Sequence, residues 1–238
     1  MYNTIILSLA LLLLAAGSKP GNAQTVIISE EPGTRELDTG YGMNRKHYSH
    51  SWLSVDFIAG RPDSRGGDIR YWRSRSLSYG YRYKRKYSEV FSGGLEFLIS
   101  RRAFYPEQDP YKMVPDTVIN DKEKLVFLQA GTGAYQRLNF GRRGDHIGSF
   151  LDLGIYGGWN FHVRHITDNS LEGGERVRVR RTRLDYPVKF EYGLLARLGS
   201  GNVVLRGTYR LSDLFKADSG LPELPRLTLG LEIGMHPF

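Results

Sequence analysis

The chain has 238 residues, a formal net charge of +8 and no cysteine, which excludes disulfide bonds and a lipid anchor on a cysteine. Its 28 glycines and 15 tyrosines argue against a helical bundle. The excess of basic over acidic residues is typical of proteins that bind acidic partners. Nucleic acid is not expected to be that partner, because the N-terminus described next indicates an exported protein.

An apolar run from Ile5 to Ala16 is broken only by Ser8. It is too short to span a bilayer comfortably and fits the apolar core of a signal peptide, with a cleavage site at Gly21–Ala23. A retained anchor helix is the alternative. We expect residues 1–23 to be removed on export, and residues 24–50, which are polar and contain Pro and Gly breakers, to form a flexible periplasmic arm.

Apolar and polar residues then alternate with period two, which predicts β-strands. The segments are Ser51–Gly60, Ser76–Lys86, Glu89–Ser100, Glu123–Phe140, Ser149–Phe161, Tyr186–Leu198, Asn202–Ser212 and Arg226–Phe238. Short turns and long charged loops connect them in alternation. This alternation of short and long connections predicts an all-β fold: an eight-stranded antiparallel up-and-down transmembrane β-barrel over residues 51–238.

The two faces of these strands predict which side meets lipid. The face opposite the leucines combines glycine with charges of both signs, and a narrow barrel interior needs small residues between long ones. We therefore expect an apolar face toward lipid and a polar, plugged lumen. The expected lumen charge network comprises Asp56, Arg82, Glu96, Asp152, Lys189, Glu191, Arg197, Arg206, Arg210 and Glu232.

A soluble lipocalin-like barrel is the alternative, although the Gly-x-Trp start usual in that family is missing. Aromatic residues near strand ends on the apolar face are expected at the membrane interface, and we count Trp52 among them although it lies off the parity of that face.

Three segments resemble the eight-stranded outer-membrane β-barrel family that includes PorT-like proteins. They are SLSYGYRYKRKYSEVFSGGLEFLISRR (76–102), LDLGIYGGW (151–159) and LTLGLEIG (227–234). The terminal Phe238 is similar to the aromatic terminus that outer-membrane assembly machinery recognises, although it lies off the parity of its strand. The resemblance implies that the protein lies in the cell outer membrane and takes part in an outer-membrane assembly such as a secretion system.

The segment ERVRVRRTR (175–183) lies in a long loop and places arginine beside alternating valine. Arginine suits bidentate contact with phosphate, so we expect a surface glycolipid as partner. The alternative is that these arginines extend strands above the membrane and pair with acids of the loops. The candidates are Arg176, Arg178, Arg180, Arg181 and Arg183.

Candidates for catalytic and metal-binding groups lie at the end of the fifth predicted strand and in the loop that follows it. His162, His165, Asp168, Ser170 and Glu172 could supply a hydrolase with a nucleophile, a base and an orienting acid, but only if they converge. His162 and His165 could also bind a metal ion, but two histidines without a carboxylate at a fixed spacing are weak evidence for a metal site. We expect no catalytic residues, no metal and no cofactor.

The sequence thus predicts a non-enzymatic outer-membrane barrel that is structural or an accessory subunit, with the arm as a peptide for a protein partner. A narrow transport channel and a lipid-modifying enzyme are the alternatives.

Overall fold

The computed structural model describes residues 40–140, 147–171 and 174–235. The expected signal peptide, most of the expected arm, Glu172 and the terminal Phe238 lie outside these residues. The strands are β1 (His47–Ala59), β2 (Arg75–Lys86), β3 (Phe91–Phe104), β4 (Lys122–Phe140), β5 (Ser149–Ser170), β6 (Arg176–Thr182), β7 (Phe190–Ser200), β8 (Val203–Arg210) and β9 (Leu227–Met235), with a short 3-10 helix at Ala217–Ser219.

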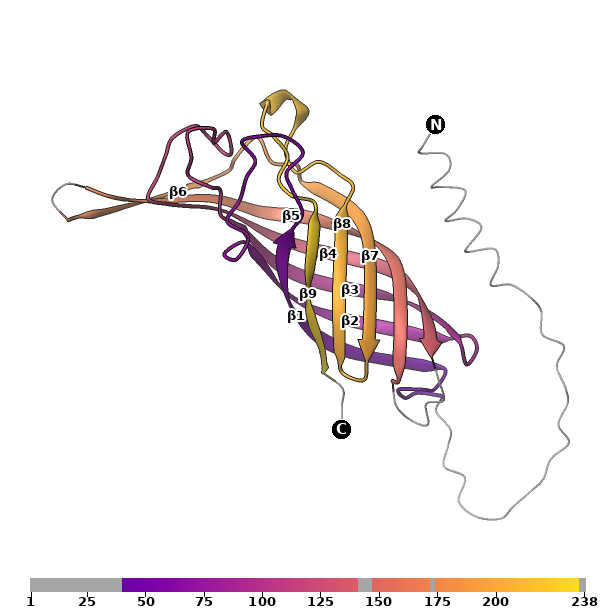
Figure 1. Cartoon of the computed structure of the whole chain (residues 1–238). Coiled ribbons are helices and arrows are strands. Elements are labelled where there is room, and N and C mark those ends of the chain that lie inside the picture. The colour runs from indigo at the N-terminus through magenta and orange to yellow at the C-terminus, as the bar shows by residue number, and fades with distance from the viewer. Residues whose placement is uncertain (1–39, 141–146, 172–173, 236–238) are drawn as a thin grey trace, which may run out of the picture. The chain divides into compact units, whose positions relative to one another are not determined.

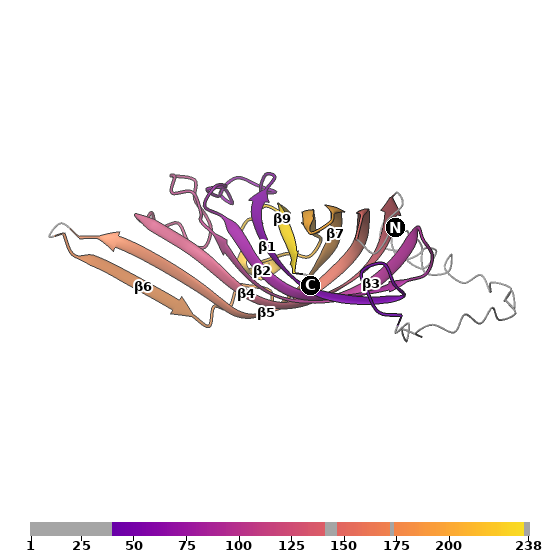
Figure 2. The same ribbon diagram turned by 90° about the horizontal axis from the view of Figure 1, so that it is seen from below.

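The strands form a closed antiparallel ring in the order β4-β3-β2-β1-β9-β8-β7-β5, because β4 also pairs with β5. This confirms the predicted eight-stranded up-and-down barrel (Figure 1). The ninth strand, β6, pairs only with the outer part of β5, from Arg164 to Ser170. The hairpin of β5 and β6 therefore reaches away from the ring, as Figures 1 and 2 show. No helix in the described part of the chain has the length and apolar character that a membrane crossing requires.

Burial alternates along most of the ring strands, as the period-two pattern predicts, and most regularly in β2 and β7. Every second residue of β7 is buried, and the residues between are exposed. The exposed set is largely apolar and includes Leu53, Val55, Leu77, Tyr79, Leu95, Phe97, Ile99, Leu153, Ile155, Leu194, Leu205, Leu231 and Ile233. The charged face points inward, which is the inverse of a soluble barrel.

The lumen is narrow enough to require glycine at particular positions. A Cβ on Gly80 would collide with the ring of Trp52, and one on Gly230 would collide with Asp56. Trp52 is fully buried inside the barrel. The expectation that Trp52 lies at the membrane interface is therefore wrong, because its parity places it with the inward residues.

Several strand ends differ from their predicted positions. β1 begins at His47 rather than Ser51, and β5 runs to Ser170 rather than Phe161. β7 begins at Phe190 rather than Tyr186, and Pro187 instead forms an isolated bridge with Phe215. Proline has no N–H to donate to a ladder, so the regular strand starts after it.

Each end of the lumen carries an apolar cluster. At the end with the long loops, the cluster joins strand residues to residues from the loops after β1, β3 and β8: Ile58, Ile69, Phe104, Val114, Leu125, Phe127, Leu214, Phe215 and Leu224. At the end with the short turns, Tyr48, Ile147, Phe150 and Val204 pack together. The long loops thus fold over the barrel instead of extending freely into water.

We expect Leu231→Arg to lower the free energy of unfolding by about 2–4 kcal/mol, because Leu231 faces outward in mid-strand, where lipid would surround it. Met235→Arg, on the same face near the end of β9, should cost only about 0–1 kcal/mol. Urea unfolding in lipid vesicles measures both. Equal costs at the two depths would contradict the assignment of the outer face to lipid.

Candidate functional site

A chain of alternating charges crosses the lumen. It runs from Arg137 (β4) to Asp152 (β5), Arg197 (β7), Glu96 (β3), Arg82 (β2), Glu232 (β9) and Arg206 (β8). Period two places each of these side chains inside, and the closed ring brings seven strands close enough for them to meet. All of them are buried.

The contacts are mostly short and bidentate. Arg137 donates to both oxygens of Asp152 at 2.6 and 2.9 Å, and Arg82 donates to both oxygens of Glu232 at 2.7 and 2.9 Å. Glu96 Oε2 also accepts hydrogen bonds from Arg82, at 3.0 Å, and from Arg197. The contact of Arg206 with Glu232 is longer, at 4.0 Å. Bidentate charge-assisted bonds fix the orientation of both partners.

Aromatic rings cover the guanidinium groups of this network. Trp52 lies 4.7 Å from Arg206 and 5.3 Å from Arg82, measured from ring centroid to Cζ. Tyr135 lies 4.6 Å from Arg197, and Phe150 lies 3.4 Å from Arg137. Cation–π contacts of this kind stabilise desolvated cations and fill the space between the charged pairs.

The remaining predicted lumen residues occupy positions beside this chain. Glu191 pairs with Arg102 at 2.8 Å, and Arg210 pairs with Glu223 at 2.9 Å toward the loops. Asp56 accepts a hydrogen bond from Ser54 at 3.0 Å. Sequence reasoning omitted Arg137 and Arg102 from the network, although both lie in predicted or extended strands at inward positions and parity could have identified them.

Lys189 was predicted to belong to the lumen network, and this is wrong. It is exposed in the bend before β7, which begins at Phe190. The regular strand does not reach Lys189, so its inward parity has no effect on where the side chain points.

The spaces between the lumen side chains are small. One cavity of about 30 Å³ is lined by residues that include Asp56, Arg102, Gln129 and Arg206, and another of about 10 Å³ lies near Arg82 and Phe150. A volume of this size holds single water molecules rather than a file of hydrated ions. Several buried nitrogens that have no hydrogen-bond partner in the described residues, including Arg206 Nε and Gln129 Nε2, border the larger cavity.

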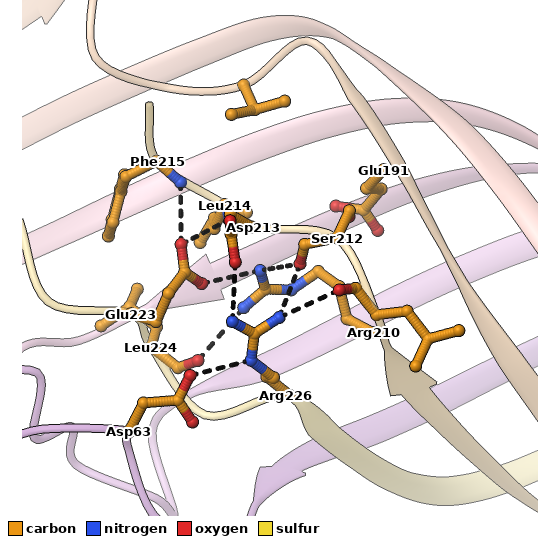
Figure 3. A network of polar contacts seen from close by, with 12 residues as sticks. Asp63, Glu191, Arg210, Ser212, Asp213, Leu214, Phe215, Glu223, Leu224 and Arg226 are labelled. Carbon is orange, nitrogen blue, oxygen red and sulfur yellow. Dashed lines mark hydrogen bonds and ion pairs between the residues drawn. The ribbon is translucent and has the colours of Figure 1, made fainter. Parts of the chain in front are cut away.

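A second polar network fixes the loop after β8 to the barrel (Figure 3). Glu223 accepts hydrogen bonds from the backbone N–H groups of Leu214 and Phe215 at 2.7 and 3.1 Å and from Arg210 at 2.9 Å. Arg226 donates to Asp213 at 2.7 Å and to Asp63 of the loop after β1 at 3.0 Å. These bonds hold two long loops against each other above the apolar cluster.

The candidate loop arginines fall on two faces of the β5–β6 hairpin. Arg178 faces outward and donates two hydrogen bonds to Asp168, the shorter of 2.5 Å, which lowers the pKa of that carboxyl. Arg181 faces the other way and lies 3.9 Å from Asp116. Arg176 and Arg180 share the outward face, and Arg183 follows the strand with a positive φ of 59°. Pairing with loop acids, the alternative weighed from the sequence, therefore holds for Arg178 and Arg181.

The structure brings one predicted histidine into a buried polar cluster. His165 Nε2 lies 2.6 Å from Glu123 Oε1, and Lys112 Nζ lies 2.5 Å from Glu123 Oε2. Oxygen and nitrogen atoms of Asp116, Glu123 and His165 come within 4.8 Å of one another, as metal ligands do. The Lys112 ammonium, however, already supplies the positive charge at Glu123, so the arrangement favours an ion-paired cluster over a cation site.

The residues considered for a hydrolase do not converge among the described residues. His165 and Ser170 lie on opposite faces of β5, about 16 Å apart at a rise of about 3.3 Å per residue. Asp168 is paired with Arg178, and His165 is paired with Glu123. A nucleophile, a base and an orienting acid need direct hydrogen-bond contact, which this set lacks.

Comparison with known proteins gives limited information. No protein-family model matches the chain, and no curated protein matches it. Among solved structures, the chain is similar to the attachment invasion locus protein Ail of Yersinia pestis, solved in complex with the heparin analogue sucrose octasulfate. The TM-score is 0.36 and the identity 14%, over 79% of this chain and 97% of that one. The PorT-like resemblance stays a prediction, and the fold described above rests on the strand pairing itself.

We expect Glu96→Gln to destabilise the barrel by about 3–5 kcal/mol, because the change leaves Arg82 and Arg197 buried with one carboxylate fewer between them. Glu89→Gln, in an exposed pair with Lys86, is the matched control and should have little effect. Urea unfolding in micelles compares the two. Equal midpoints would show that the buried network does not hold the barrel together.

We expect the Glu123 cluster to lose stability in acid. Burial acts to raise the pKa of Glu123, but hydrogen bonds from His165, Lys112 and Gln108 outweigh it and keep the pKa below its usual value. The cluster's contribution is therefore complete above the unfolded pKa of about 4.3 and is lost as pH falls through the lowered folded value. The measurement is the urea midpoint of wild type and Glu123→Gln from pH 7 to pH 3, and the two curves should approach each other in acid. A difference that stays constant with pH would refute this coupling.

Proposed function

We propose that the protein is an integral outer-membrane barrel with a plugged lumen, which serves as a non-enzymatic anchor and docking platform. The observation that carries the proposal is the order of layers across the barrel: an apolar outer face, an interior crossed by a chain of ion pairs, and an apolar cluster at each end of the lumen. Lipid is the surrounding that satisfies an apolar exterior of this extent, because water would leave it unburied.

A plugged interior follows from the energetics of the lumen. Opening a path for ions would separate buried charge pairs such as Arg82–Glu232 and Arg137–Asp152. Removing one partner of such a pair typically costs about 3–5 kcal/mol, so a rearrangement that breaks several is strongly disfavoured. The proposal therefore favours an anchor over the transport channel that the sequence left open.

A lipid-modifying activity is also disfavoured. His165 is engaged by Glu123 inside a cluster that is closed by Lys112, and Ser170 lies on the opposite face of β5. We propose that these groups stabilise the loops and perform no chemistry.

The partner is proposed to be a protein of an outer-membrane assembly such as a secretion machine. Outer-membrane glycolipid is a second contact, through basic residues near the loops. The loops support this role because they are held in fixed positions: Arg226 joins two of them, and Glu223 binds the backbone of one. A rigid loop surface is the form that a docking platform needs, since little ordering entropy is lost on binding.

We expect affinity purification in mild detergent from native outer membranes to recover a protein partner in fixed stoichiometry. The measurement is mass spectrometry of the eluate, for the full chain and for a variant that lacks residues 25–38. Loss of the partner in the variant alone would assign docking to the arm, and retention would assign it to the loops. Recovery of the barrel without any stoichiometric protein would overturn the accessory-subunit role.

A further inference from the structure

One side of the barrel carries a row of cations directly above the apolar belt. The register of β2 to β5 aligns the outward residues in rows that run across the sheet. The uppermost apolar row is Tyr79, Ile99, Ala130 and Trp159. The next two rows, toward the loops, contain Arg101 and then Arg75 and Arg164. Lys124 follows one row higher, beside Ile166.

We call Arg75, Arg101, Lys124 and Arg164 the basic rim. Its residues surround a small apolar cluster of Ala103, Val126 and Ile166, which is buried although it faces outward. Long basic side chains can cover such a cluster with their aliphatic stems and keep their charged ends free. Arg75 and Arg101 are exposed, and Lys124 and Arg164 are partly buried.

The same face continues onto the β5–β6 hairpin with Arg176, Arg178 and Arg180. Asp168 is the acid among these aligned positions, and it is already paired with Arg178. The basic rim below it therefore has no acid in its own rows. Ion pairing on the surface does not explain why these cations lie together, because like charges repel one another.

Height above the apolar belt determines which cations can meet lipid headgroups. Successive rows are about 7 Å apart along a strand, at about 3.3 Å per residue. The headgroup layer adds only about 5–8 Å to each side of a hydrocarbon core of about 30 Å. Arg101, one row above the apolar belt, lies inside this layer, and Arg75 and Arg164 lie one row farther out. Lys124 lies in the next row, which it shares with Arg180 of the hairpin, whereas Arg178 and Arg176 lie one and two rows beyond that.

We propose that the basic rim binds the phosphate groups of an outer-leaflet glycolipid, with its acyl chains against the apolar belt directly below. This rests on the proposed function, because it requires the barrel to be in an outer membrane. It moves the expected glycolipid contact from the tip of the hairpin to the rows next to the belt. Arginine at three of the four positions suits bidentate contact with phosphate.

The test uses the full chain, folded in detergent, and diphosphorylated lipid A as the probe. Binding is measured by native mass spectrometry for wild type, for the rim variant Arg101→Gln/Arg164→Gln, and for the hairpin variant Arg176→Gln/Arg178→Gln. Both variants lose the same net charge on the same face. We expect the rim variant to bind about tenfold more weakly or worse, and the hairpin variant to bind within about twofold of wild type.

Dephosphorylated lipid A is the second probe, and wild type should bind it as weakly as the rim variant binds the phosphorylated form. Equal losses in the two variants, or unchanged binding in the rim variant, would overturn the proposal. So would equal binding of the two lipids. Heat-modifiable migration in gels shows that each variant is a folded barrel. A folded, membrane-inserted barrel that fails this test leaves the proposed function standing, whereas a chain that does not insert refutes both.

Discussion

Burying charge inside a narrow barrel is the constraint on which the rest of the structure depends. An unpaired charge in the lumen would cost several kcal/mol, so each one needs a partner that its own strand cannot supply. Glu96 of β3 meets arginines of β2 and β7, and Glu232 of β9 meets arginines of β2 and β8. Closure of the ring therefore brings together the strands that carry the partners of these charges.

The apolar parts of the molecule follow from the same constraint. With the charges inside, every outward position is free to be apolar, and the ring presents leucine, isoleucine and aromatic residues around its circumference. The clusters around Phe104 and Phe150 lie at the two ends of the lumen, beyond the ion pairs. The long loops gain their order from the first of these clusters and from the bonds of Glu223 and Arg226.

Strand pattern and parity predict the ring, the two faces and most of the lumen residues, because a period of two is a local property of the sequence. The prediction that Lys189 lies in the lumen is wrong, because strand parity carries no information where Pro187 interrupts the hydrogen-bond ladder. Parity also identifies Trp52 as an inward residue. The prediction placed it at the membrane interface because aromatic rings prefer that position. The pairing of each charge, the apolar cluster under the loops and the contact of His165 with Glu123 depend on segments distant in sequence, which one sequence without structure does not connect.

The central claim is that the lumen is closed by its own ion pairs. Conductance of the purified, folded protein in planar bilayers tests it most directly, with insertion verified separately by protection from protease. The account predicts insertion with no steady ionic current above the background of the bilayer. A steady unitary conductance at low voltage would contradict it, because ions would then cross a path that the pairs of Arg82, Glu96 and Glu232 should block.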